Sequence, residues 1–278
     1  MAEKKEQYIA AYIADYSSVE VVLSHAMFLS NILRKGLILL RIADPKYTIK
    51  TTEQAEQELK KIKNSITCPT YVTYCAVKGK TKEILTALPV AFNVVAVVGA
   101  VDKNATSKSP MARKNVLKDF SECKTAFLLA QKKLSDPETM KNIAFTVDFK
   151  KETKDKLLWA SYFARFNGSL VHAIAPNYTD EFLKARRIAN MKFLDKMFGN
   201  LNVECKKHLI EKKSHYVDVD ALEYAATNHF GMLISVTTKE KDVMEYFIGV
   251  QEDRTVVNPH EMPILYLNPR EDLYVLCD

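Results

Sequence analysis

The chain has 278 residues, a length that favours two domains at about 100 to 200 residues each. Its content of 47% apolar and 27% charged residues is typical of a globular protein and excludes a disordered or fibrous chain. The formal net charge of +6 is modest, and acidic residues separate the lysines of most lysine clusters, so the sequence does not predict binding to nucleic acid.

In the first half, short runs rich in Val, Ile and Leu alternate with amphipathic segments of helical length. Continuous apolar runs such as VVAVV are typical of strands that are buried on both faces of a parallel sheet. Ser17 followed by Glu20 predicts a capping box for the first helix. We expect strands near 7–14, 36–42, 70–76, 92–99 and 124–130, and helices near 18–34, 51–64, 79–88 and 110–120.

The second half repeats this order. A strand ends at Asp15 and Gly36 follows 21 positions later; a strand ends at Asp148 and Gly168 follows 20 positions later. A duplicated unit of this kind determines the architecture, and Asn167-Gly168 predicts a left-handed helix stop. We expect domains at 1–135 and 140–278, joined by QKKLSDPETMKN, and second-half strands near 142–148, 169–174, 201–209, 231–236 and 262–267.

The segment IAFTVDFKKETKDKLLWASYFARFNGSLVHAI resembles the opening of a universal stress protein. FIGVQEDRTVVNPHEMPILYL is similar to the closing helix and last strand of that family, with Gly249, Asp253 and Arg254 near the expected places. The resemblance implies an α/β fold in which a doubly wound, Rossmann-like domain with a five-stranded parallel sheet occurs twice. It also implies that the two halves pair as an internal pseudo-dimer, and it leaves open a further homodimer.

Nucleotide-binding members of the family carry G-x2-G-x9-G-[S/T] after the fourth strand, where glycines let backbone N–H groups approach phosphates. The first half keeps only Gly99, with Asp102 at the place of the second glycine. The second half keeps only Gly249, with Val236 and Lys239 at the other two places. We therefore expect no cofactor bound in the family's manner. The alternative is an adenine nucleotide (ATP, ADP or AMP) bound through an altered loop.

A ligand crevice at the carboxyl ends of the strands remains an expectation. Asp15 and Asp148 match the family's aspartate near the nucleotide, although an aspartate that ends a strand often only caps the next turn. In the first-half loop, Ser109 as N-cap with Pro110 at the first helical position predicts a site for a small anion; the alternative is a solvated loop. The candidate crevice residues are Asp15, Gly99, Lys103, Ser109, Arg113, Asp148, Thr237, Thr238, Gly249 and Arg254.

Catalytic and metal sites are not predicted. The five cysteines are odd in number and widely spaced without a C-x-x-C pair, and Cys205 and His208 would point to opposite faces of a strand. The six histidines are scattered and match no catalytic motif. His25 lies in an apolar helix and is expected to be packed, while His215 with Asp218 and Asp220 is interpreted as the entry of a helix.

The segment TDEFLKARRIANMKFLDKMFG carries an apolar stripe beside Arg186 and Arg187. The stripe is interpreted as core packing, with a partner-binding face as the alternative. It consists of Phe182, Ala185, Ile188, Ala189 and Phe193.

Neither a signal peptide nor an apolar run of about 18 residues is present, so the sequence predicts a cytoplasmic protein that does not enter a membrane. The leading hypothesis is a non-enzymatic stress-response protein that acts through contacts with unidentified protein partners. The alternative is an adenine-nucleotide-binding stress protein, which includes a slow ATPase. A third hypothesis is an enzyme of a related α/β nucleotide-binding superfamily.

Overall fold

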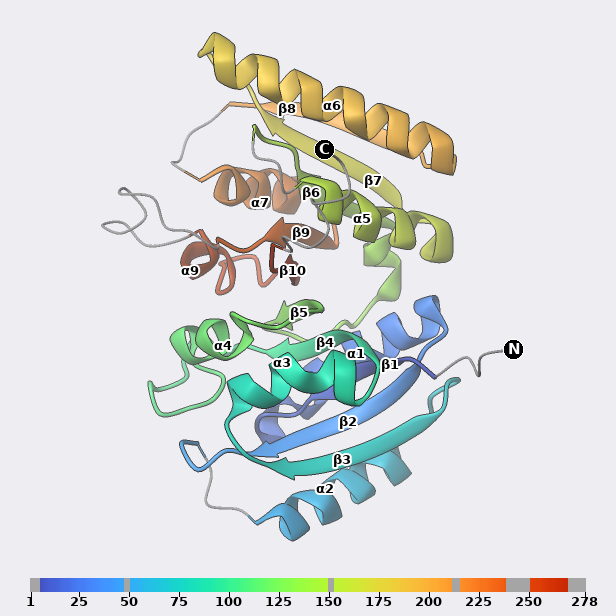
Figure 1. The fold of residues 1–278 in the computed structure, drawn as a ribbon, viewed down its shortest axis with the longest axis vertical. Helices are drawn as coiled ribbons and strands as arrows, with labels where there is room; N and C mark the ends of the chain where they lie inside the picture. The colour runs from blue at the N-terminus through green and yellow to red at the C-terminus, as the bar shows by residue number, and fades with distance from the viewer. Residues whose placement is uncertain (1–5, 48–50, 150–152, 212–215, 239–250, 270–278) are drawn as a thin grey trace. The chain divides into compact units, whose positions relative to one another are not determined.

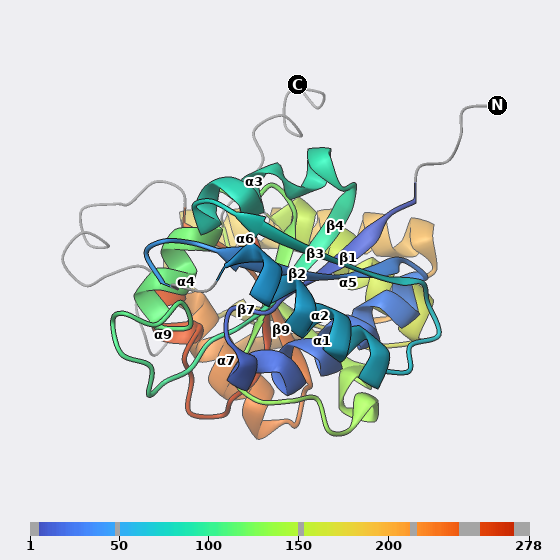
Figure 2. The ribbon, with the colours of Figure 1, turned by 90° about the horizontal axis from the view of Figure 1, so that it is seen from below.

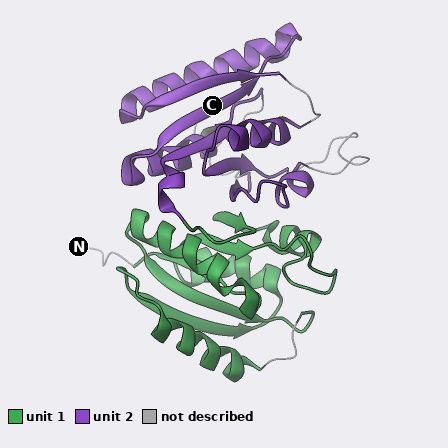
Figure 3. Ribbon diagram, turned by 180° about the vertical axis from the view of Figure 1, so that it is seen from behind, with its two compact units in different colours: residues 1–135 green, residues 136–278 purple. Residues whose placement is uncertain are grey.

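The structure is a computed structural model that describes residues 6–47, 51–149, 153–211, 216–238 and 251–269. The chain divides into two compact units, residues 1–135 and 136–278 (Figure 3). Each unit has five parallel strands in one sheet with helices on its faces (Figure 1). The predicted α/β fold, with the same unit present twice, is confirmed.

Unit 1 has the strand order β3-β2-β1-β4-β5, and every neighbouring pair is parallel. Helices α1 and α2 cover one face of this sheet, and α3 lies on the other (Figure 2). The elements are β1 (Tyr8–Tyr12), η1 (Tyr16–Ser18), α1 (Val19–Leu33), β2 (Gly36–Ala43), α2 (Thr52–Ser65), β3 (Val72–Lys78), α3 (Thr81–Ala91), β4 (Val94–Ala100), α4 (Arg113–Phe120) and β5 (Ala126–Ala130).

Unit 2 has the strand order β10-β9-β6-β7-β8, again with parallel neighbours. Its central strand β6 corresponds to β1, because Tyr12 pairs with Leu40 and Thr146 pairs with Ile174 in the same register. The elements are η2 (Pro137–Lys141), β6 (Asn142–Thr146), α5 (Thr153–Asn167), β7 (Leu170–Pro176), α6 (Glu181–Leu201), β8 (Cys205–Ile210), α7 (Val217–Thr227), β9 (Met232–Val236), α9 (Glu252–Thr255) and β10 (Ile264–Leu267).

Apolar strands form the core of each unit. Every residue of β2, β5, β9 and β10 is buried, and β1, β4, β6 and β7 are buried over most of their length. Burial of each Leu, Ile or Phe side chain contributes about 1.5 to 3 kcal/mol, which explains why continuous apolar runs select a sheet covered on both faces. Most polar side chains therefore lie at the strand ends and on the outer faces of the helices, with buried exceptions inside the strands such as Arg41, His172 and Ser235.

Of the two helix ends predicted from the sequence, one is confirmed and the other is wrong. Gly168 follows α5 with φ +66°, as the left-handed stop requires. The capping box predicted from Ser17 and Glu20 is wrong, because the turn η1 precedes α1. Asp15 caps η1 in a box with Ser18, and the Ser18 side chain makes no capping bond at the start of α1.

Gly231 allows a close approach that no other residue allows. Its N–H donates to the Asn142 carbonyl at 2.8 Å, and a Cβ atom here would collide with the backbone of Thr139 and Met140. We expect Gly231→Ala to lower the free energy of unfolding by about 2 kcal/mol or more. The matched control is Gly199→Ala in α6, where a Cβ would meet nothing within 4 Å and helix propensity predicts a gain of up to about 1 kcal/mol. Equal urea midpoints for the two variants would contradict this account.

Candidate functional site

Ligands of doubly wound sheets bind beyond the carboxyl ends of the strands, where the strand order reverses. In unit 1 this point lies between β1 and β4, and in unit 2 between β6 and β9. The chain segments that follow these four strands are therefore the candidate sites. They include Asp15, Asp148 and the loops after Gly99 and Val236.

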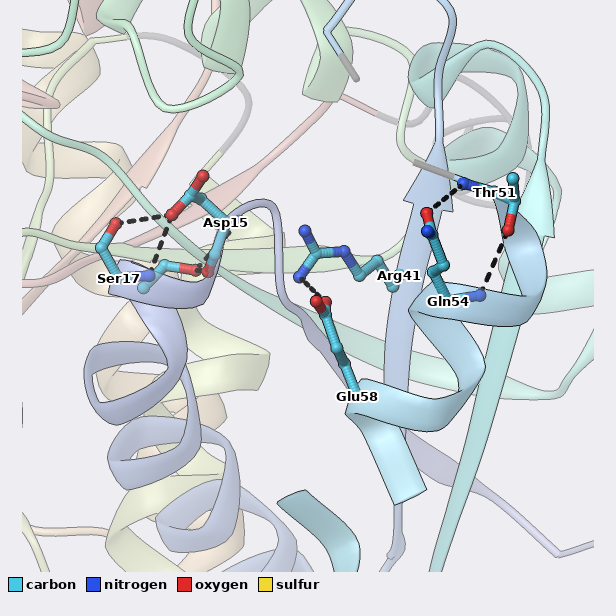
Figure 4. A network of polar contacts seen from close by, with 7 residues as sticks. Asp15, Ser17, Arg41, Thr51, Gln54 and Glu58 are labelled. Carbon is cyan, nitrogen blue, oxygen red and sulfur yellow. Dashed lines mark hydrogen bonds and ion pairs between the residues drawn. The ribbon is translucent and has the colours of Figure 1, made fainter. Parts of the chain in front are cut away.

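Asp15 acts as a cap. Its Oδ1 accepts hydrogen bonds from the N–H and the hydroxyl of Ser17, both at 2.9 Å (Figure 4). The Ser18 hydroxyl donates to the Asp15 carbonyl at 2.6 Å. These hydrogen bonds satisfy polar groups of the first turn after β1. Capping is therefore sufficient to explain an aspartate at this position.

The polar groups of the loop after β4 form hydrogen bonds within the loop and with Asn115 of α4. Gly99 lies inside β4, where a Cβ would come within 3.1 Å of the Phe120 ring and 3.2 Å of Leu129, so packing explains this glycine. The Asp102 carboxylate accepts the N–H of Asn104 at 2.8 Å, and the Asn115 side chain donates to the carbonyls of Ser107 and Ser109 at 2.8 and 2.7 Å.

The anion site predicted in this loop rests on a wrong helix start. Helix α4 begins at Arg113 with Ala112 as N-cap, so Ser109 is not an N-cap and Pro110 is not the first helical residue. The Ser109 hydroxyl instead accepts the N–H of Met111 at 3.1 Å. Lys103 and Arg113 are exposed residues of the loop and of the first turn of α4. The helix starts later than predicted because Ser109 and its neighbours form turns that the Asn115 side chain stabilises.

A polar network that the sequence did not predict lies at the carboxyl ends of β2 and β3. The Asp44 carboxylate accepts the N–H of Thr81 at 2.7 Å and the N–H of Lys46 at 2.9 Å, and thus caps α3 from another strand. Burial opposes ionisation of Asp44, but these donors outweigh it and lower its pKa. Tyr47 donates to Asp119 at 2.8 Å, while burial raises the pKa of that carboxyl group.

An ion pair closes the opposite side of unit 1. The Arg41 guanidinium of β2 lies 3.2 Å from the Glu58 carboxylate of α2 (Figure 4). Thr51 and Gln54 form a reciprocal capping box at the start of the same helix, with contacts of 3.1 and 3.3 Å. The polar groups at the carboxyl end of β2 and at the start of α2 are thus satisfied by side chains of the protein itself.

A buried carboxylate, that of Glu252, lies beside the first described residues after β9. Glu252 accepts hydrogen bonds from the N–H of Thr238 and, at 3.3 Å, from its hydroxyl. Burial raises the pKa of Glu252 against these donors. The Thr237 hydroxyl lies 2.5 Å from Asn268 Oδ1. The donors of the two described residues that follow β9, Thr237 and Thr238, are therefore used within the chain.

Three further residues that the sequence analysis singled out belong to this part of unit 2. Asp218 is buried in the first turn of α7 and accepts the hydroxyl of Ser235, which confirms that this segment is a helix entry. Arg254 is exposed, with its guanidinium 6.0 Å from the centre of the Tyr216 ring. Gly249 lies outside the described residues.

Asp148 lies in a different environment from Asp15. Its carbonyl accepts the amide of Asn190 of α6 at 2.7 Å. Burial raises the pKa of the neighbouring Tyr178, the charge of Asp148 adds to this effect, and the charge of Arg187 opposes it. Lys156 of α5 is also buried and donates to Thr146, the last residue of β6, at 2.9 Å. This group lies on the α5 and α6 side of unit 2.

Two of the histidines, His172 and His208, belong to a chain of hydrogen bonds that the sequence did not predict. His172 contacts Asn142 at 3.1 Å and His208 at 2.9 Å, and His208 contacts the Tyr224 hydroxyl at 3.0 Å. The Phe230 ring stacks on His172 with centroids 3.9 Å apart. No cluster of three or more metal-ligating side chains occurs within the described ranges. This chain of contacts explains His172 and His208 as structural residues.

Acid sensitivity follows from two buried histidines. Burial lowers the pKa of His25, packed in α1 as expected, and of His172 to about 4, with the charges of His208 and Lys206 adding to the effect at His172. Unfolded histidine titrates near pH 6.5, so acidification from pH 6.5 to 5 protonates mainly the unfolded state and lowers stability by about 1 to 2 kcal/mol per histidine. Urea unfolding of His25→Met should show a shallower dependence on pH in this range. A slope equal to that of the wild type would refute the buried-histidine explanation.

Comparisons with known proteins bear on the fold. A scan of protein-family models finds no match, and a search of curated proteins finds none either. Among solved structures, a universal stress protein from Archaeoglobus fulgidus DSM 4304 superposes with a TM-score of 0.68 and 13% identity, over 95% of this chain and 97% of that one. A putative universal stress protein from Pseudomonas aeruginosa UCBPP-PA14 gives 0.63 and 14%, over 98% and 96%.

A third structure shows that this fold also occurs inside another kind of protein. The cytoplasmic domain of a prokaryotic cation chloride cotransporter superposes with a TM-score of 0.55 and 11% identity, over 98% of this chain and 99% of that domain. No helix of the described part of the chain is long and apolar enough to cross a membrane. The common feature of these structures is the backbone arrangement, and on that ground the chain has the tandem, Rossmann-like fold of the universal stress proteins.

Proposed function

We propose that the chain is a cytoplasmic stress-response protein of the universal stress protein type, which acts through protein contacts and not through catalysis or ATP bound in the family's manner. The likeness of the fold supports the class of protein. The described residues that follow β4 and β9 support this proposal, because Asp102 accepts the N–H of Asn104 and Glu252 accepts the N–H of Thr238.

The observation that carries this proposal is an exposed apolar stripe on α6. Phe182, Ile188 and Phe193 are 66%, 40% and 40% exposed, and Ala185 and Ala189 lie between them on the same face. The interpretation of this stripe as core packing is therefore wrong. The inward face of α6 instead presents Arg187, Leu194 and Phe198.

The corresponding helix of unit 1 shows that the stripe is not a general feature of the fold. In α2 the apolar residues Ala55, Leu59 and Ile62 are all buried, and its outer face is polar. Helix α2 lies close to both β2 and β3 along its length, whereas α6 lies closest to α5 and runs along the edge of unit 2 (Figure 1). Large exposed apolar groups in a soluble domain commonly mark an interaction surface.

The chemistry of α6 favours an acidic amphipathic helix of another protein as the partner. Helix α6 carries five basic residues and two acidic ones, so two copies of it would repel each other. Ala185 and Ala189 are one turn apart on the exposed face, and their small side chains leave room for the side chains of a docked helix. Arg186, with its guanidinium 5.6 Å from the centre of the Phe182 ring, is placed to meet a carboxylate at the border of the stripe.

Substitutions on α6 test this proposal. We expect Phe182→Ser with Phe193→Ser, and separately Arg186→Glu with Lys192→Glu, to reduce capture of the same partner proteins from a lysate by at least tenfold. Lys60→Glu with Lys61→Glu on the exposed face of α2 is the matched control and should leave capture unchanged. Quantitative mass spectrometry of the captured proteins is the measurement, with circular dichroism to confirm folding.

Two results would contradict the proposal. One is equal capture by the stripe variants and the wild type. The other is a concentration-dependent homodimer in sedimentation experiments that the stripe substitutions abolish, because the stripe would then contact a second copy of this chain and not an acidic helix.

A further inference from the structure

Strand β3 is the outer strand of unit 1. Its one neighbour among the described strands is β2, and the two pair in a continuous parallel register from Val72 to Lys78. The first six residues of β3 are half-buried, and its one charged residue, Lys78, is the last. A regular edge strand without charges along its length is a template on which a further strand can pair.

The outer strand of unit 2 differs from β3. Lys206 and Lys207 are exposed in β8 and place two adjacent charges on that edge. Charged side chains on an edge strand oppose pairing with another strand, and lysine is common in this role. Of the two outer strands, β3 is therefore the one suited to pairing.

The backbone of β3 presents a defined set of groups at its outer edge. At the start of the strand the Leu37 N–H donates to the Tyr71 carbonyl at 2.8 Å, and at its end the Gly79 N–H donates to the Ala43 carbonyl at 3.4 Å. The register between these two hydrogen bonds is continuous, so every second residue from Tyr71 to Gly79 faces β2. The residues whose N–H and C=O point to the outer edge are therefore Val72, Tyr74, Ala76 and Lys78.

Helix α2 lies along β3 and runs in the opposite direction (Figure 1). Hydrogen bonds at the start of α2 lower the pKa of Glu53, and the charge of Lys78, at the end of β3, adds to this effect. Burial raises the pKa of Cys75, in the middle of β3, and the charge of Glu56 adds to that shift. The first half of α2 therefore lies beside the second half of β3.

One stripe of charged residues on α2 faces the β3 side. The stripe consists of Glu53, Glu56, Lys60 and Lys63. Spacings of three and four residues place all of them on one face of the helix. The two glutamates are close to β3, as described above, and the Lys63 ammonium lies 5.7 Å from the centre of the Tyr74 ring of β3. The stripe is acidic in its first half and basic in its second half, so its charges are complementary to those of the same stripe turned end to end.

We propose that a second copy of this chain pairs with β3 as an antiparallel strand, about a twofold axis at Cys75. Cys75 is the middle residue of β3, so this register pairs the strand over its full length. It places Tyr74 of each copy opposite Ala76 of the other. Both residues point their backbone groups to the outer edge, as a hydrogen-bonded antiparallel pair requires. The sheet of unit 1 thereby continues into that of the second copy.

The same axis makes the charged stripes of the two copies complementary. It sets the two α2 helices side by side and antiparallel, so Glu53 of one copy faces Lys63 of the other, and Glu56 faces Lys60. Antiparallel pairing also keeps the two Lys78 side chains apart, because they lie at opposite ends of the paired strands. This surface belongs to unit 1 and does not depend on the α6 stripe.

Charge reversals in α2 test the proposal by sedimentation equilibrium. Lys60→Glu with Lys63→Glu gives an all-acidic stripe, and Glu53→Lys with Glu56→Lys gives an all-basic one. Each double variant alone should raise the Kd of the dimer by about tenfold or more at low salt, because the attractions across the axis become repulsions. An equimolar mixture of the two variants should dimerise again, because their stripes are complementary. Circular dichroism confirms that each variant is folded.

Phe182→Ser with Phe193→Ser is the control for these measurements. Both residues lie on α6 of unit 2, so this variant should dimerise with the Kd of the wild type. The proposal is overturned if the wild type stays monomeric at every concentration, or if the mixture of the charge-reversed variants dimerises no more tightly than each variant alone.

Two substitutions within β3 test the register. Ala76→Pro removes an N–H that faces the outer edge and not β2, so this variant should fold and remain monomeric. The twofold axis brings the two Cys75 Cα atoms to about 4.5 Å, which is within the range of a disulfide. Diamide, which accepts the two thiol hydrogens, should therefore give a covalent dimer of the wild type in much higher yield than of Cys75→Ser. Equal yields, or a folded Ala76→Pro protein that still dimerises, would overturn this pairing.

Discussion

Burial of each parallel sheet on both faces is the constraint on which the rest of the structure depends. Helices cover both faces, so the strands consist almost entirely of apolar residues and their polar neighbours collect at the strand ends. A buried polar group at these ends needs a partner, since an unsatisfied donor or charge costs more than a hydrogen bond gains. How each half satisfies the groups at its carboxyl edge therefore determines which of them are left for a ligand.

The two halves satisfy these groups with different residues. Unit 1 uses side chains from distant parts of its sequence: Asp44 accepts the N–H of Thr81, and Arg41 pairs with Glu58. Unit 2 does the same on the α7 and α9 side, where Glu252 accepts the N–H of Thr238. The two α7 and α9 carboxylates, Asp218 and Glu252, are both buried and both accept hydrogen bonds from neighbouring groups. A duplicated fold has thus kept one architecture while its two edges have acquired different chemistry.

Local pattern was sufficient to predict the strands, the helices and the repeat. Runs such as VVAVV have the composition of buried strands, and Gly168 adopts the left-handed conformation that a helix stop needs. The sequence suggested that Asp15 acts as a cap, but it did not predict that Ser18 completes the capping box. The reason is that no pattern distinguished the short turn η1 from the start of α1. Ser109 was misplaced for a similar reason, because Asn115 holds the preceding turns from within the helix.

The chemistry of the sites depended on contacts that local pattern does not carry. Asp44 and Thr81 are 37 residues apart, and Arg41 meets Glu58 only after α2 packs on β2. The sequence placed Arg186 and Arg187 together beside an apolar stripe but could not tell which one faces inward. Because apolar residues occur on several sides of α6, its amphipathic pattern is weak, and the structure was needed to show that Arg187 is buried while Phe182 is exposed.

The central claim is the proposal that the chain binds no nucleotide in the manner of the universal stress proteins. Titration of the wild-type protein with ATP, ADP and AMP, followed by calorimetry, tests it most directly. The account predicts no saturable heat with any of the three nucleotides. Stoichiometric binding of ATP would contradict it and would favour the alternative of a nucleotide bound through an altered loop.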